Sequence, residues 1–217
     1  MIKKMKPLEL LKEHCKFEED KPFDCYVILA IARKKYNAGF TQNTEVVHRF
    51  VIKQPKDVER KYNNIKAMVD ASKHNFYIYI SVNPRNALKA HFILQQMYGK
   101  WLQEHISGSD NIAMKFKRVD NQFYSALMQP ASRSGKTWVV DVDTKDKNLV
   151  QDIVDELTKY TRLIRKVETV NGYHLLIDPF NRQDFILTHS GGLCVDWRDV
   201  VDIKTDALLF VENVKNE

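Results

Sequence analysis

The sequence predicts an α+β protein in which an N-terminal mixed α/β module, residues 1–115, packs on a C-terminal βαββαβ module, residues 116–217. Runs rich in β-branched and aromatic residues alternate with segments of helical periodicity. Asn171-Gly172 separates two short apolar runs, and this dipeptide is the strongest short-range hairpin signal. The segment 107–111 (SGSDN) is the clearest internal break, while seven Gly and six Pro in the whole chain leave little room for a flexible linker.

The first module is expected to alternate strands and helices. Leu8, Leu10 and Leu11 fit one face of a short N-terminal helix. The further elements of this module, in order, are strands over 24–34 and 44–54, a helix over 57–73, a strand over 75–84 and a long amphipathic helix over 85–106. A helix over 119–129, beyond the boundary at residue 115, leads into the second half of the chain.

The second module is more regular. Its expected elements are a strand over 137–143, a helix over 147–161, strands over 164–170 and 173–180, a short helix over 182–187 and a final strand over 206–212. This order is a ferredoxin-like or RNA-recognition-like layout, with helices on one face of an antiparallel sheet. The other face is then free to carry a site. A two-residue hairpin loop would place Thr169 opposite His174.

Composition sets only broad limits. Hydrophobic residues make up 44% and charged residues 29% of 217 residues, which is typical of a globular protein. A net charge of +6 is compatible with a polyanionic partner, but the basic residues are scattered. No apolar run reaches the ~18 residues of a membrane span, so no membrane partner is expected. Cys15, Cys25 and Cys194 have no paired spacing, which argues against disulfides and zinc and for a cytoplasmic location.

Two aspartates close the strand over 137–143. Alternation places Val139, Asp141 and Asp143 on one strand face. Two adjacent carboxylates repel each other unless a cation lies between them, and hard divalent cations prefer oxygen ligands. The sequence therefore indicates a metal site here. The alternative is a strand that simply ends in a solvated polar loop.

Two further motifs carry polar residues on predicted strands. His174 follows the hairpin turn and is expected near the middle of the sheet, beside the strand that holds the aspartates. The alternative for His174 is a packed, hydrogen-bonded core histidine. Asp202 lies in "VVDI" beside a strand; the alternative is a loop carboxylate, and Asp196 in "LCVDW" competes for the same role.

Three segments, in chain order, resemble the three motifs of the archaeo-eukaryotic primase superfamily: "WVVDVD", "NGYHLLI" and "VVDI". The likeness is closest to the compact primase-polymerases of phages and plasmids. The resemblance covers the second module well and the first only in outline. It implies a metal-dependent nucleotidyltransferase, a DNA primase or DNA-directed polymerase, that extends a strand on a single-stranded template.

The resemblance also implies roles for residues. Asp141 and Asp143 would bridge two Mg²⁺ or Mn²⁺ ions, Asp202 would complete the first, and His174 would contact the phosphates of the incoming nucleotide. Gly172 would let the backbone approach those phosphates. The sequence departs from the family at this glycine, where relatives often have serine, and in lacking a cysteine cluster for zinc.

The partners implied are nucleoside triphosphates and single-stranded DNA or a primer-template, with a helicase or replication proteins acting in trans. The implied location is the cytosol of a bacterium or of a phage-infected host.

Two basic positions outside these motifs are candidates for phosphate contacts. Arg85 stands at a strand-to-helix junction, where the alternative is a solvated arginine at a helix start. Lys136, with Arg133, lies in "SRSGKT", which fails as a P-loop because Pro130 replaces the first glycine and a strand follows. Both basic side chains remain candidates for contacts with backbone phosphates.

Two other classes of function compete with the enzyme. A non-catalytic nucleic-acid-binding module would use the same sheet, but it should present aromatic and basic residues there rather than acids. An Asp-x-Asp glycosyltransferase would need a larger doubly wound domain and would leave His174 without a role.

Overall fold

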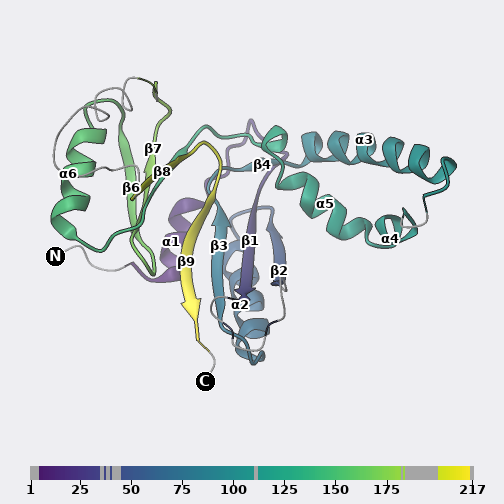
Figure 1. The fold of residues 1–217 in the computed structure, drawn as a ribbon, viewed down its shortest axis with the longest axis horizontal. Helices are drawn as coiled ribbons and strands as arrows, with labels where there is room; N and C mark the ends of the chain where they lie inside the picture. Colours follow the sequence, from purple (N-terminus) through teal and green to yellow (C-terminus); the bar gives the residue numbers. More distant parts are fainter. Residues whose placement is uncertain are drawn as a thin grey trace.

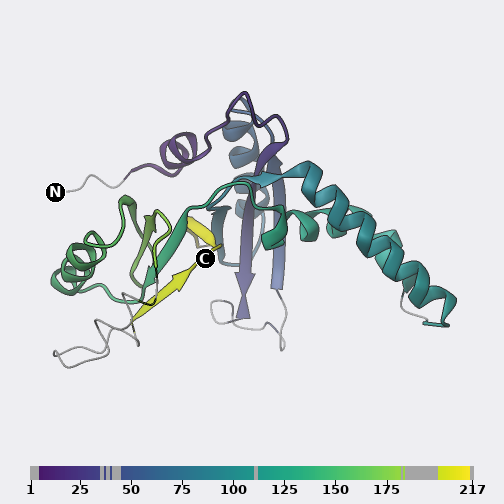
Figure 2. The same ribbon diagram turned by 90° about the horizontal axis from the view of Figure 1, so that it is seen from above.

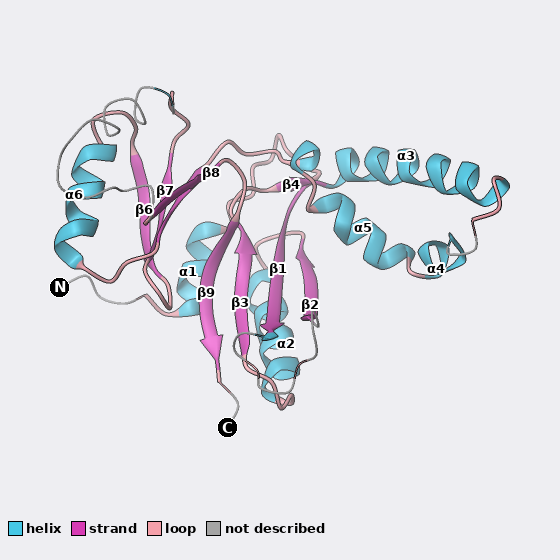
Figure 3. Ribbon diagram, in the orientation of Figure 1, coloured by secondary structure: helices cyan, strands magenta, loops and turns pink. Residues whose placement is uncertain are grey.

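The structure is a computed structural model that describes residues 5–34, 37, 40, 45–109, 112–181, 183 and 200–215. Within these residues the chain is a mixed α+β fold with two antiparallel sheets (Figure 3). The helices are α1 (Pro7–His14), α2 (Asp57–Asp70), α3 (Ala87–Ile106), α4 (Ile112–Lys117), α5 (Val119–Leu127) and α6 (Lys147–Leu157). The strands are β1 (Asp24–Arg33), β2 (Glu45–Ile52), β3 (Phe76–Ser81), β4 (Arg85–Asn86), β5 (Trp138–Val142), β6 (Leu163–Glu168), β7 (Tyr173–Ile177), β8 (Val201–Lys204) and β9 (Leu208–Val214).

The first sheet has the strand order β2-β1-β3-β9, with β4 paired to β1. Strand β1 is apolar on both faces because both faces are covered. Ile28 and Ala30 pack in the core formed with α1 and α2, whereas Val27 and Leu29 pack in the core formed with α3 and α5. This double burial explains why β1 reads as a continuous apolar run instead of an alternating one.

Helices α3, α4 and α5 form an arm that extends away from both sheets (Figures 1 and 2). Helix α3 begins at Asn86, whose side chain accepts a hydrogen bond of 2.9 Å from the Lys89 N–H, as an N-cap residue does. Its buried residues Ala90, Leu94 and Trp101 pack against α4 and α5.

The second sheet has the strand order β6-β7-β5-β8 and is covered on one face by α6. Val140 and Val142 of β5 pack against Val150 and Ile153 of the helix. Asp146 caps α6 by accepting hydrogen bonds from the N–H groups of the first turn. The alternation predicted for β5 is confirmed, since its apolar face lies against the helix.

The predicted final strand of the second module is wrong. Strand β9 pairs with β3 and belongs to the first sheet, where Leu209 and Val211 join the core. The fourth strand of the second sheet is β8, which carries Asp202 itself. The sheets therefore do not divide the chain at residue 115, and the expected helix over 182–187 lies largely outside the described residues.

The hairpin is confirmed, but its predicted loop length is wrong. Val167 and not Thr169 lies opposite His174, so the loop spans four residues, 169–172. The Thr169 N–H donates to the Gly172 carbonyl at 2.8 Å, and the Gly172 N–H donates to the Thr169 hydroxyl at 3.0 Å. These two bonds hold the four-residue loop closed. The shift of two residues keeps every side chain of the hairpin on its expected face.

The uncovered face of the second sheet is only partly free, contrary to the expectation. Val139 and Leu176, opposite each other on β5 and β7, are buried in the core of the first module. The end of this face that carries Asp141 stays open, since the side chain of Asp202 there is 66% exposed. Among the described helices, none is both long and apolar enough to span a membrane.

Candidate functional site

Three predicted residues lie in one row across the second sheet. Asp141 on the central strand β5 is directly opposite His174 on β7 and directly opposite Asp202 on β8. Directly opposed residues of antiparallel strands point to the same sheet face. The structure thus brings together residues that are far apart in the sequence.

Asp141 is the centre of this row. Its Oδ1 lies 3.4 Å from Nε2 of His174, and its Oδ2 lies 2.6 Å from Nζ of Lys204. The hydrogen bond with His174, assisted by Lys204, lowers the pKa of Asp141 to about 2, although partial burial acts in the opposite direction. The carboxylate is therefore ionised at any physiological pH.

The imidazole of His174 connects the two sheets. The backbone N–H of Phe210, on β9, donates to Nδ1 of His174 at 3.3 Å. Because Nδ1 accepts this bond, the neutral ring carries its proton on Nε2, which faces Asp141. Both nitrogens of this histidine therefore have a partner. The side chain is still 12% exposed and reaches the open end of the sheet.

Lys204 belongs to the site and was missed by the sequence analysis. Its ammonium lies 2.6 Å from Asp141 and 3.3 Å from Asp202, between the two carboxylates. Burial alone would lower the pKa of Lys204, but hydrogen bonds with the two aspartates raise it above its ordinary value. The sequence pattern that could have identified Lys204 is the alternation in "VDIK", which places Lys204 on the same strand face as Asp202.

A cavity of about 150 Å³ lies between the two sheets at this point. One wall carries Asp141, Asp143, His174 and the hairpin residues 169–171. The other wall comes from the first sheet and consists of Arg33, Tyr77, Tyr79 and Phe210. An acidic wall therefore faces an aromatic wall with one arginine.

Asp143 and Asp202 are the more exposed acids of the site. Asp143 follows β5, where its N–H donates to the carbonyl of Val200 at 2.9 Å, and its side chain lines the cavity. The Asp202 side chain is 66% exposed. Two solvent-exposed carboxylates beside the fixed Asp141 can turn toward a cation that enters from the open side.

Gly172 is required by packing against β5. A Cβ atom at this position would lie 1.8 Å from the carbonyl oxygen of Val142, which no side chain tolerates. This close approach brings the hairpin loop onto the end of β5. The expected approach of Gly172 to phosphates stays a prediction.

Arg85 lies apart from the cavity. Its side chain is 1% exposed, and its guanidinium makes two hydrogen bonds of 2.8 Å with the carboxylate of Asp206. The alternative of a solvated arginine at a helix start is wrong, because β4 pairs with β1 and buries the residue. This ion pair ties the start of α3 to the turn before β9, and a nucleotide contact has no support from the geometry.

The remaining predicted residues do not join the row. Lys136 is exposed and precedes β5, at the opposite end of that strand from Asp143. Arg133 donates to the carbonyl of Thr205. Asp196, the competitor of Asp202, lies outside the described residues.

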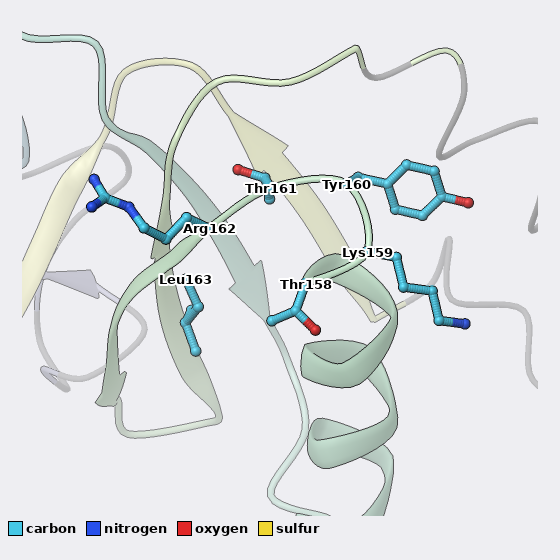
Figure 4. Close-up of a pocket in the computed structure, with 6 residues that line it drawn as sticks. All are labelled: Thr158, Lys159, Tyr160, Thr161, Arg162 and Leu163. Atoms are coloured by element: carbon cyan, nitrogen blue, oxygen red, sulfur yellow. The ribbon is translucent and has the colours of Figure 1, made fainter.

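A second hollow, lined by residues 158–163 after α6, has no convergent chemistry (Figure 4). Its two cationic side chains, Lys159 and Arg162, point apart in the picture and pair with Glu156 and Asp178. No three His, Cys, Asp or Glu side chains in the described part of the chain are placed as a ready metal-binding set. The cavity between the sheets is thus the better candidate site.

Comparisons of the chain with protein-family models, with curated proteins and with solved structures found no match. The basis for a function is then the geometry of the cavity. That geometry offers an ionised carboxylate fixed by a histidine, two further carboxylates able to reorient, and a facing aromatic wall.

Proposed function

We propose that this chain is a metal-dependent nucleotidyltransferase that adds nucleotides to a nucleic-acid strand on a single-stranded template, as a DNA primase or DNA-directed polymerase. The observation that carries the proposal is the row of Asp202, Asp141 and His174 across β8, β5 and β7, with Asp143 on the same cavity wall. The strand order β6-β7-β5-β8 supports an RNA-recognition-like module, because its first and third strands are central.

The carboxylates fit a hard divalent cation. Asp141 and Asp202 are directly opposed like charges, an arrangement that is unfavourable unless a cation lies between them. The ammonium of Lys204 now lies there. Asp141, Asp143 and Asp202 would hold Mg²⁺ or Mn²⁺, which would supply charge neutralisation on a triphosphate and activation of a 3′-hydroxyl.

His174 is suited to an anionic ligand. Its Nε2 proton points into the cavity toward Asp141, while Phe210 holds the other nitrogen. A phosphate oxygen arriving beside Asp141 would accept this proton in a hydrogen bond. The bond to the β9 backbone fixes the ring in this orientation, so the Nε2 proton would only have to shift from Asp141 to the phosphate oxygen.

The aromatic wall is suited to the base or sugar of a nucleotide. Tyr79 and Phe210 are in edge contact, with ring centroids 5.9 Å apart. They face the acidic wall across the cavity. Stacking on aromatic side chains tolerates every base, which fits a template-directed enzyme.

The alternatives fit less well. A binding module without metal would bring the phosphate backbone against Asp141, whose low pKa keeps it charged. A glycosyltransferase would need a doubly wound parallel sheet, and both described sheets are antiparallel.

The test is incubation with single-stranded DNA, labelled nucleotides and Mn²⁺ or Mg²⁺, with and without a primer. We expect the wild-type protein to incorporate nucleotides and Asp141→Asn to lose incorporation by at least about a hundredfold, because an amide is a poorer ligand for a hard cation. Asp152→Asn, the same change on the exposed side of α6, is the matched control and should remain active. Wild-type incorporation by Asp141→Asn, or none by the wild-type protein in any arm, would refute the proposal.

A further inference from the structure

Helix α3 carries an exposed apolar stripe in addition to its buried face. Leu88, Phe92, Leu102 and Ile106 are 41%, 55%, 52% and 84% exposed. Among the described residues, seven of the twelve exposed large hydrophobic side chains lie on the arm formed by α3, α4 and α5. Such a concentration on one projecting element indicates an interaction surface.

The stripe follows the spacing of a coiled-coil seam. Gln95 and Gly99 lie between its two apolar pairs, and the six positions are separated alternately by four and three residues. The buried residues Leu94 and Trp101, which contact the rest of the arm, lie on the other side of the helix. The stripe therefore faces away from the core of its own chain.

Gly99 has open space around its Cα within the described part of its own chain. A Cβ atom at this position would meet nothing within 4 Å, so the fold does not require a glycine. A glycine inside a helix costs about 1 kcal/mol relative to alanine. A missing side chain on an exposed seam instead leaves a hole that a partner side chain can fill.

The stripe is complementary to itself when one copy is reversed. With Met97 as the centre, Leu88 falls opposite Ile106 and Phe92 falls opposite Leu102. Gln95 falls opposite Gly99, so that a long side chain meets the hole. We propose that two copies of this chain associate through antiparallel α3 helices. The twofold axis would cross the stripe at the height of residue 97, whose own side chain packs on the opposite face of the helix. A twofold interface uses the same patch on both subunits, as this pattern does.

Charge and area favour a second copy over other occupants. Lys89 is the one charged residue beside the stripe and falls near Gln103 of the other copy, without like-charge repulsion. A nucleic acid would need more positive charge along the stripe. With about 150–250 Å² for a fully exposed large side chain, the exposed fractions of the four apolar residues correspond to roughly 350–580 Å² per copy. With flanking polar groups this reaches the low end of specific interfaces, about 600 Å² per partner. We therefore expect a weak, reversible dimer.

The first test is sedimentation velocity of the full chain between about 1 and 200 µM. We expect a monomer–dimer equilibrium for the wild-type protein and a monomer for Gly99→Glu, which fills the hole with a charge. Because Gly99 is open in its own chain, this variant should keep or raise the unfolding temperature, so lost dimer is not lost fold. Lys100→Glu, one residue along and off the stripe, should remain dimeric. A wild-type monomer throughout, or a dimeric Gly99→Glu, would overturn the proposal.

The second test fixes orientation by disulfide formation in a Cys194→Ser background. Phe92→Cys with Leu102→Cys should give a covalent dimer, because the two positions meet between antiparallel copies. Within one helix they are about 15 Å apart, which excludes an internal bond. Phe92→Cys alone should stay monomeric on oxidation. A covalent dimer from the single variant would indicate parallel helices and overturn the proposal, as would none from the double variant.

Discussion

Replacing Lys204 with methionine should increase the affinity of the metal-free protein for Mn²⁺. In the structure the ammonium lies between Asp141 and Asp202, at 2.6 and 3.3 Å, where a divalent cation would bind. A metal ion must therefore displace the ammonium from both carboxylates. Methionine keeps the length of the side chain but removes the competing charge.

The size of the effect follows from the geometry. Hydrogen bonds to charged groups contribute about 1.5–3 kcal/mol. The Lys204 side chain is 40% exposed, so solvent screening reduces this to about 1–1.5 kcal/mol. Removing that competition corresponds to a dissociation constant for Mn²⁺ that is lower by about tenfold. Without metal, the two aspartates face each other with no ammonium between them and only His174 beside Asp141, and the unfolding temperature should fall.

The assay is a titration of Mn²⁺ followed by isothermal calorimetry or by the electron spin resonance of the free ion, neither of which depends on catalysis. Lys136→Met is the matched control, because it removes the same charge at the opposite end of β5. We expect little change in the affinity of this control. Equal affinities in Lys204→Met and wild type, or an equal gain in the control, would refute the idea that Lys204 holds the cation position.

Two further predictions concern stability. Arg85→Met should lower the free energy of unfolding by about 3–5 kcal/mol because it leaves Asp206 unpaired, and for a protein of this size the unfolding temperature should fall by roughly 6–20 °C. In thermal unfolding followed by circular dichroism, the double variant with Asp206→Leu should recover most of this loss. A loss below ~1 kcal/mol in the single variant would contradict the importance of the buried pair. His14 is partly buried and bonded to the carbonyl of Ser81 at 3.1 Å, and burial lowers its pKa to about 4. The unfolded chain takes up this proton below pH 6.5 while the folded chain does so only near pH 4, so stability is full above pH 6.5 and declines by about 3 kcal/mol as the pH falls to 4. Urea unfolding at pH 7.5 and pH 5 should show this decline in the wild-type protein and a smaller one in His14→Phe; an equal decline in both would exclude His14 as its source.

Local signals in the sequence were sufficient for most of the elements and for the spacing of the acids. The β-branched run of β1, the helical spacing of α2 and α6, and the Asn171-Gly172 turn each act within a few residues, and the structure has an element at each place. Alternation alone placed Asp141 on the face opposite the helix-covered one. The error in the predicted length of the hairpin loop did not change this placement, because a shift of two residues keeps every side chain on the same strand face.

Tertiary structure decided which strands pair and what surrounds the acids. The apolar run of β9 could join either sheet, and it joins the first because Leu209 and Val211 complete that core. That choice leaves β8 as the partner of β5, which places Asp202 opposite Asp141 and Lys204 between them. It also turns the Phe210 N–H toward His174, and the turn before β9 carries the carboxylate that pairs with the buried Arg85. The sequence by itself determined the faces and the local elements, because these depend on neighbouring residues. Strand partners and ion pairs between distant segments depend on which of several possible pairings buries the most apolar surface over the whole chain. A pattern within a few residues cannot predict that choice.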